Sequence, residues 1–274
     1  MGENQSTSQP DSQSKGASAV QPKNKQDMRA RLNGVLLLLP LLGFLWLGGP
    51  LLSLVLTALC VIMAFEVSKM TLKSAPVWQS LILSVWVALP AFLAFSGISP
   101  MLILGFLLLS FCLLSWRFTL LAGMYTSLLG LCFFALIALQ NQPDAQLILI
   151  YLIALTSAVD VGAYFAGRAL GGPKLAPAIS PGKTISGALG GIVAGLCAYL
   201  ALDSVQAISL GWPIGFVLAL TLLAQLGDLL ESALKRQTGV KDSGQIIPGH
   251  GGLLDRFDGY VLTLPLVWFW LYQS

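Results

Sequence analysis

The chain has 274 residues, of which 56% are hydrophobic and only 10% are charged, with a formal net charge of +3 and a mean hydropathy of +0.80. Because a soluble domain typically carries about 25% charged residues, this composition excludes an ordinary soluble protein and indicates an integral membrane protein. Nothing in it calls for a nucleic-acid partner, and none is expected.

The first 31 residues differ in kind from the rest of the chain. They are rich in Gln, Ser, Lys and Asn and have almost nothing to bury, so we predict a disordered tail over 1–31. Arg29 and Arg31 precede an apolar run, as in a signal peptide, but the long polar lead and the lack of a small-residue cleavage site favour an uncleaved first span.

Apolar stretches near the roughly 20 residues of a helical span recur along the chain after residue 33. We therefore predict an all-α, polytopic integral membrane protein with about nine transmembrane helices, in a single domain over 32–274. The predicted spans are 34–48, 51–69, 77–95, 101–115, 118–139, 146–166, 184–202, 210–230 and 259–272. The first, fourth and ninth are short for a span.

The basic residues predict the orientation. If the tail lies inside, every one of the 15 Lys and Arg falls in the tail or in an inside loop, and none in an outside loop. The positive-inside rule then places the N-terminus in the cytoplasm and the C-terminus outside. This one-sided charge favours contact with anionic headgroups or anionic substrates, and we expect a bacterial inner membrane as the location.

Most acidic residues gather at the predicted cytoplasmic ends of spans: Asp160, Asp228, Glu231, Asp255 and Asp258. Helical spacing would put Asp228 and Glu231 on one face, and likewise Asp255 and Asp258. A carboxylate near hydrocarbon is costly unless it is paired, hydrated or metal-bound, so a functional role is the default interpretation. The alternative is that these are ordinary helix-end residues, solvated or paired with neighbouring arginines.

A sixth acid, Glu66, is assigned no chemistry and is expected to pair with Lys69 or Lys73.

Carboxylate ligands without a His or Cys cluster favour Mg²⁺, which is usually held by one or two carboxylates plus substrate phosphates. Basic residues suited to phosphate oxygens alternate with these acids: Lys235, Arg236, Lys241 and Arg256. The combination suits phosphoryl or nucleotidyl transfer. His250, the only histidine, is interpreted equally as a phosphate donor or as a structural residue of the loop.

A second predicted inner loop, 167–191, contains "GKT" at its centre. It is not a phosphate-binding P-loop, because Pro177 stands where that motif needs Gly. Ser180, Lys183 and Thr184 nevertheless precede a predicted helix, whose free N–H groups favour an anion. The alternative is a helix cap with a snorkelling lysine. Further along, glycines at 187, 191 and 195 predict close helix packing, within one subunit or across a homodimer.

The stretch "SALKRQTGVKDSGQIIPGHGGLLDRFDG", residues 232–259, resembles the signature of the phosphatidate cytidylyltransferase (CDP-diacylglycerol synthase) family, with its S-x-x-K-R-x4-K-D-S and P-G-H-G-G-x-x-D-R-x-D elements. Similar segments begin at Asp160, Lys174 and Ala224, so the resemblance is strongest over 160–259. One position departs from the family: Ser186 stands where many members carry an acidic or amide residue, and it is left out of the site.

The resemblance implies a Mg²⁺-dependent transfer of CMP from CTP to phosphatidate, a membrane lipid, giving CDP-diacylglycerol and pyrophosphate. It implies metal ligation by Asp228 and Asp255 with help from Asp258, whereas Asp160 is a weaker candidate for a second cation or for orienting the nucleotide. The catalytic set expected on this basis is Asp228, Lys235, Asp255 and Arg256. The expected substrate-binding set is Ser180, Lys183, Thr184, Ser232, Arg236, Lys241 and His250.

Two other classes of protein stay open. A CTP-dependent lipid kinase acting on a polyprenol would also bind a cytidine nucleotide at a membrane face, but it would release CDP rather than pyrophosphate. A transporter tends to place its polar site near the bilayer midplane, whereas the charges here lie at one face.

Overall fold

The computed structural model describes residues 49–72, 76–117, 119–205, 209–244, 246 and 251–273. The predicted tail, the predicted first span at 34–48 and His250 lie outside these residues. The described helices are α2 (Gly49–Thr71), α3 (Val77–Phe95), α4 (Pro100–Arg117), α5 (Leu120–Leu139), α6 (Ala145–Leu170), α7 (Ile185–Asp203), α8 (Ile214–Gln237) and α9 (Tyr260–Gln273), with one turn of 3-10 helix, η2 (Leu254–Arg256).

Seven of these helices, α2 to α8, are long and apolar enough to cross a membrane. The last helix, α9, has 14 residues and contains Pro265. At 1.5 Å per residue it is about 21 Å long, shorter than a hydrocarbon core of about 30 Å. The prediction of a helical membrane protein is therefore confirmed, whereas the number of about nine transmembrane helices is not confirmed by the described residues.

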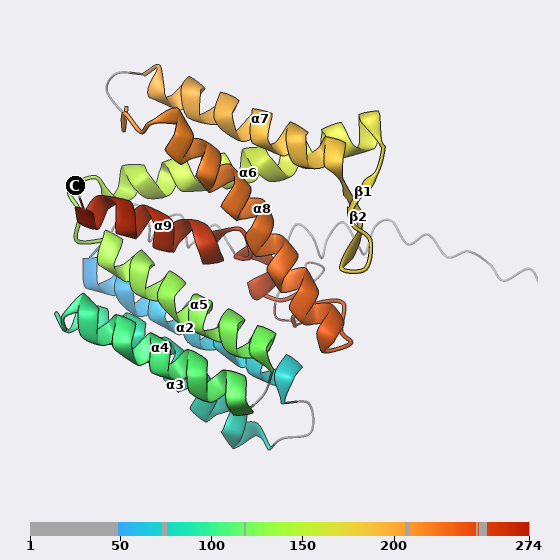
Figure 1. Cartoon of the computed structure of the whole chain (residues 1–274). Coiled ribbons are helices and arrows are strands. Elements are labelled where there is room, and N and C mark those ends of the chain that lie inside the picture. Colours follow the sequence, from blue (N-terminus) through green and yellow to red (C-terminus); the bar gives the residue numbers. More distant parts are fainter. Residues whose placement is uncertain are drawn as a thin grey trace, which may run out of the picture.

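Successive helices run in opposite directions, so the chain alternates between the two ends of the bundle (Figure 1). The last turns of α2, α4, α6 and α8 carry basic residues, and all four helices finish at the same end. The segments that follow α6 and α8 hold the other described Lys and Arg. We call this the basic end of the bundle.

Helix α5 is the centre of the packing. It contacts α2, α3, α4 and α9, and its side chains Tyr125, Leu129 and Phe133 are almost completely buried. Hydroxyl groups in this apolar setting bond to carbonyls of the preceding helical turn, as in Thr126 Oγ1 to Ala122 O at 2.8 Å and Ser84 Oγ to Ser80 O at 2.7 Å. Such local bonds satisfy polar groups that lipid cannot solvate.

The closest helix pair is α6 with α7, and glycines make the approach possible. A Cβ on Gly187 would lie 2.8 Å from Ala163 O, and one on Gly191 would lie 2.9 Å from Val159 O. A Cβ on Gly195 would meet Thr221 of α8 at 2.6 Å. The predicted packing role of these glycines is confirmed, and their contacts lie within one subunit.

The predicted loop between α6 and α7 contains regular structure. It forms an antiparallel hairpin of β1 (Lys174–Ala176) and β2 (Ser180–Thr184), which extends from the basic end (Figure 1). The Ile179 N–H donates to Ala176 O at 3.1 Å and closes the turn. Arg236 Nε of α8 donates to Ile179 O at 3.0 Å and ties this hairpin to the bundle.

Candidate active site

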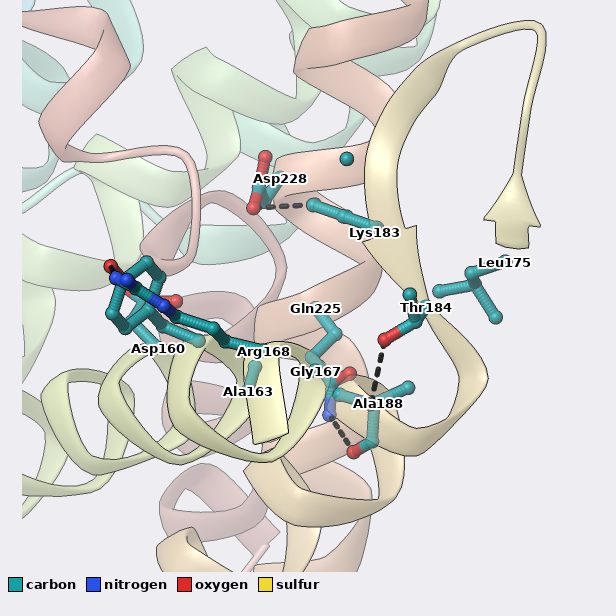
Figure 2. A pocket seen from close by; sticks show the side chains of 13 residues that line it. Asp160, Ala163, Gly167, Arg168, Leu175, Lys183, Thr184, Ala188, Gln225 and Asp228 are labelled. Carbon is teal, nitrogen blue, oxygen red and sulfur yellow. Dashed lines mark hydrogen bonds and ion pairs between the residues drawn. The ribbon is translucent and has the colours of Figure 1, made fainter. Parts of the chain in front are cut away.

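A pocket of about 490 Å³ opens at the basic end, between α6, β2, α7 and α8 (Figure 2). Its charged lining residues are Asp160, Arg168, Lys183 and Asp228. The remaining wall is made of small or apolar residues and a few polar ones, among them Ala163, Tyr164, Gly167, Leu175, Thr184, Ala188 and Gln225. The pocket therefore offers charges of both signs beside an apolar surface.

Two predicted site residues form an ion pair across this pocket. Lys183 Nζ lies 2.5 Å from Asp228 Oδ2, and their side chains are 28% and 31% exposed. Lys183 comes from the hairpin and Asp228 from α8, so the pair joins two segments far apart in the sequence. Ser232, one turn later on α8, donates from Oγ to Asp228 Oδ1 at 3.5 Å.

The start of α7 is capped by one of its own residues. Thr184 Oγ1 accepts the Gly187 N–H at 3.1 Å, which satisfies one of the free N–H groups of the first turn. The predicted alternative of a helix cap is therefore confirmed for Thr184, although this residue also lines the pocket. Ser186 donates to Gly171 O, which is consistent with leaving it out of the site. Ser180 begins β2 opposite Ala176.

Asp258 lies in the turn before α9 and is brought against α8 at Gly227. A Cβ on Gly227 would collide with the Asp258 carbonyl oxygen, so glycine is needed at this crossing. Burial raises the pKa of Asp258 to about 7, and the negative charges of Asp228 and Asp160 add to the rise, whereas the Gly259 N–H, which donates to Oδ1 at 2.7 Å, opposes it. Three of the four predicted metal ligands thus interact electrostatically.

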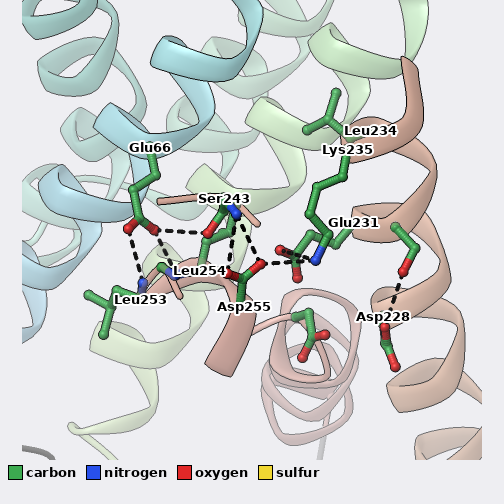
Figure 3. Close-up of polar contacts among 12 residues, drawn as sticks. Glu66, Asp228, Glu231, Leu234, Lys235, Ser243, Leu253, Leu254 and Asp255 are labelled. Carbon is green, nitrogen blue, oxygen red and sulfur yellow. Dashed lines mark hydrogen bonds and ion pairs between the residues drawn. The ribbon is translucent and has the colours of Figure 1, made fainter. Parts of the chain in front are cut away.

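Asp255 and Lys235 belong to a second polar group, which joins the last turns of α8 to η2 (Figure 3). Lys235 Nζ donates to Asp255 Oδ1 at 2.9 Å and lies 3.1 Å from Glu231 Oε1. Burial favours the neutral form of Asp255, but its contacts with Glu231, Lys235 and the Gly252 N–H hold the pKa of Asp255 below its ordinary value. One lysine therefore contacts two acidic side chains.

The expectation that Asp255 and Asp258 share a helix face is wrong. Asp255 is in η2, and α9 begins only at Tyr260, so Asp258 lies in the turn between them. The Asp255 carboxylate accepts the N–H groups of Gly252 and Ser243 at 2.8 and 3.2 Å. These bonds close a turn around the carboxylate instead of starting a helix.

Lys73, one expected partner of Glu66, lies outside the described residues, and the expected pairing with Lys69 is not made by Glu66. The Glu66 side chain is 3% exposed and accepts from the Leu253 N–H at 3.0 Å, the Leu254 N–H at 2.8 Å and Ser243 Oγ at 3.3 Å. Lys69 lies over the Phe65 ring instead. The sequence does carry one indication of this role. A carboxylate inside an apolar run is costly unless several hydrogen-bond donors bind it.

The other predicted substrate-binding residues are spread around the basic end. Arg236 donates a hydrogen bond to the hairpin, as described above. Lys241 is exposed in the segment after α8 and does not line the pocket. The charge of Arg256, on η2, acts on Asp160. The role predicted for His250 stays a prediction, because that residue lies outside the described part of the chain.

The donor chemistry of this end fits a magnesium ion in part. Among the described residues, no three acidic, histidine or cysteine side chains are gathered into a complete metal site. Mg²⁺, however, commonly takes only one or two carboxylates and completes its shell with substrate phosphates and water. Asp228 and Asp258 are of the right chemistry for that arrangement, whereas Asp255 is occupied by Lys235 and two N–H groups.

Comparison with known proteins extends over nearly the whole chain. Residues 29–273 match the cytidylyltransferase family. A phosphatidate cytidylyltransferase of Bacillus subtilis is 37% identical over 268 residues, covering 89% of this chain and 98% of that protein. Proteins of the same name from Brucella suis and Staphylococcus haemolyticus are 35% and 34% identical over 81% and 86% of this chain, and cover 85% and 95% of their own lengths. The chain therefore belongs to the cytidylyltransferase family.

Proposed function

We propose that the protein is a phosphatidate cytidylyltransferase, which transfers CMP from CTP to phosphatidate and releases pyrophosphate. The observation that carries this proposal is the similarity to proteins of that name over 81% to 89% of the chain. The pocket supports it independently, because a lipid phosphate and a nucleotide triphosphate need cations beside an apolar wall. The product, CDP-diacylglycerol, would serve phospholipid biosynthesis.

The distribution of charge supports a cytoplasmic active site in a bacterial inner membrane. The basic end of the bundle carries all the described Lys and Arg, and the positive-inside rule favours the cytoplasm for such an end. CTP would then reach the pocket directly from the cytosol. The phosphatidate headgroup would lie at the same interface, with its acyl chains along the lipid-facing side of α6, where Val161, Tyr164 and Phe165 are exposed.

The reaction joins a phosphatidate oxygen to the α-phosphorus of CTP and breaks the bond from that phosphorus to the bridging oxygen of the β-phosphate. A phosphate monoester is already largely ionised near neutral pH, with a second pKa of about 6, so the attacking oxygen needs no dedicated general base. What the site must supply is alignment and neutralisation of charge on the phosphoryl groups and on the departing pyrophosphate.

Residues from several elements would share that task. Lys183 exchanges its contact with Asp228 for a phosphate oxygen when the polyanion enters, which leaves Asp228 available as a ligand. Arg256 and Lys235 neutralise further phosphate charge, with Arg236 and Lys241 toward the outer rim and Ser180, Thr184 and Ser232 as hydroxyl donors. Asp228 and Asp258 would hold Mg²⁺, with Asp255 close by and Asp160 as a weaker candidate for a second cation.

Bound Mg²⁺ would supply Lewis-acid polarisation of the phosphoryl oxygens and template the two substrates. The protein's own contribution is to keep opposite charges paired with each other until the substrates arrive. The ion pair between Lys183 and Asp228 does so, because each side chain satisfies the other in the absence of ligand.

The proposal is tested with purified full-length protein in lipid-containing micelles, supplied with CTP, phosphatidate and Mg²⁺. The expected products are CDP-diacylglycerol and pyrophosphate in equal amounts, identified by mass spectrometry and a pyrophosphate assay. Release of CDP with phosphorylation of an added polyprenol would identify a lipid kinase instead. Labelled-solute counterflow in liposomes without turnover of CTP would identify a transporter.

A further inference from the structure

Glu66 is the one acidic side chain of the first four described helices, and it contacts the opposite end of the sequence. It lies on α2, about one and a half turns before the helix ends at Thr71. Its Oε1 accepts the Leu253 N–H, and its Oε2 accepts the Leu254 N–H and the Ser243 hydroxyl (Figure 3). A single carboxylate therefore holds two parts of the loop that joins α8 to α9, one at Ser243 and one at Leu253–Leu254.

The backbone of this loop is shaped to bring Glu66 close. A Cβ on Gly252 would lie 2.7 Å from Glu66 Oε1, and one on Gly244 would collide with the same side chain. The site therefore combines two close-approach glycines with three donors directed at one carboxylate.

The same two parts of the loop also hold Asp255. The Ser243 N–H donates to both oxygens of the Asp255 carboxylate at 3.2 Å, and the Gly252 N–H donates to Oδ2 at 2.8 Å. Ser243 thus bonds Glu66 through its hydroxyl and Asp255 through its backbone. Asp255 in turn accepts from Lys235 at 2.9 Å, so the contacts run without a gap from α2 to α8.

We propose that Glu66 is a positioning residue of the transfer reaction: its carboxylate fixes the loop at Ser243 and Leu253–Leu254 so that Asp255 and Lys235 are held in their working geometry. The inference rests on the proposed function, because it assigns Asp255 and Lys235 to the chemistry. Glu66 itself does not line the pocket, so we assign it no contact with substrate.

The chemistry requires a carboxylate at this position. An ionised carboxylate is an acceptor at both oxygens, and here each oxygen receives at least one backbone N–H. An amide would place its NH₂ group against one of those N–H donors, so Glu66→Gln keeps the shape of the side chain but opposes at least one donor. An isosteric change should therefore disturb the loop nearly as much as Glu66→Ala.

The test compares Glu66→Gln and Glu66→Ala with Ser68→Ala in the full-length protein. Ser68 is a matched control because it is also buried on α2 and its hydroxyl bonds only to Phe65 O among the described contacts. One readout is hydrogen exchange of peptides covering 251–259, with peptides from α7 as an internal reference. The others are kcat per folded protein and the Mg²⁺ concentration that gives half-maximal activity.

Both Glu66 variants are expected to exchange faster at 251–259 with unchanged exchange in α7. Their kcat should fall about tenfold or more, the size expected for lost hydrogen bonds to a charged group. Half-maximal activity should need several-fold more Mg²⁺. This readout separates the two roles, since a merely structural role would lower the amount of folded enzyme and leave the Mg²⁺ requirement unchanged. Ser68→Ala should stay within about twofold of the wild type on every readout.

If both Glu66 variants fail to fold, Ser243→Ala decides the matter, since it removes one of the three bonds and keeps the two from the backbone. It should raise the Mg²⁺ requirement measurably, and an unchanged requirement would overturn the inference. Wild-type exchange and kcat in Glu66→Gln would overturn it as well. If the wild-type protein forms no liponucleotide, the proposed function fails, and the exchange measurement alone decides whether Glu66 holds the loop.

Discussion

Replacing Asp228 with asparagine separates the chemistry of the pocket from its stability. The substitution keeps the size of the side chain and removes the charge that faces Lys183 Nζ at 2.5 Å. Because the two side chains are 28% and 31% exposed, their ion pair should contribute at most about 1 kcal/mol to stability. For a chain of this size that corresponds to a shift of no more than about 4 °C in Tm.

The effect on turnover should be far larger. Asp228 is a proposed metal ligand, and it also releases Lys183 to the substrate, so its loss should lower kcat by about 100-fold or more. The assay is formation of CDP-diacylglycerol at saturating CTP, together with a thermal unfolding curve of the same sample. Leu226→Ala is the control on the same helix, because Leu226 is 45% exposed and does not line the pocket, and it should leave kcat unchanged.

Two results would refute this reasoning. A kcat within about fivefold of the wild type would remove Asp228 from the metal site. A fall in Tm of more than about 10 °C, with activity lost in proportion to unfolding, would show that the ion pair with Lys183 is structural.

Three further substitutions and one control test other parts of the account. Lys235→Ala should raise the KM for CTP about tenfold, and should destabilise the protein by about 3 kcal/mol because Asp255 and Glu231 lose their shared cation; unchanged kinetics would contradict the phosphate role. Asp255→Asn should abolish turnover while the protein stays in the membrane fraction, and near-normal activity would exclude it from the site. Gly191→Leu should greatly reduce the yield of folded protein, because a Cβ there already lies 2.9 Å from Val159 O. Val193→Leu, on the exposed side of α7, should leave that yield unchanged; equal yields would argue against the close packing of α6 on α7.

Much of the fold follows from hydropathy and charge. The predicted spans from 51 onward correspond to α2–α9, and the packing role of Gly187, Gly191 and Gly195 follows from their four-residue spacing. These features are local in sequence, so a single chain discloses them. The hairpin at 174–184 was not predicted, because its strands are three and five residues long and one contains Pro and Gly.

The site was predicted by residue type better than by geometry. The acidic and basic residues of the signature do gather at the basic end of the bundle. Lys183 and Asp228, which have opposite charges, form an ion pair at the pocket. Sequence alone could not show that Lys235 and Asp255 form a separate group, because that depends on how the loop after α8 folds back. Glu66 was missed for the same reason: two of its three donors are backbone N–H groups 187 and 188 residues away, and those carry no side-chain signature.

The central claim is that this site transfers a cytidylyl group rather than a terminal phosphoryl group. It is tested most directly by supplying purified protein and phosphatidate with CTP labelled at either the α- or the γ-phosphorus, and by following the label into the lipid phase. The account predicts that only the α-label enters lipid, while the γ-label stays in water as pyrophosphate. Entry of the γ-label into lipid, or of neither label, would contradict it.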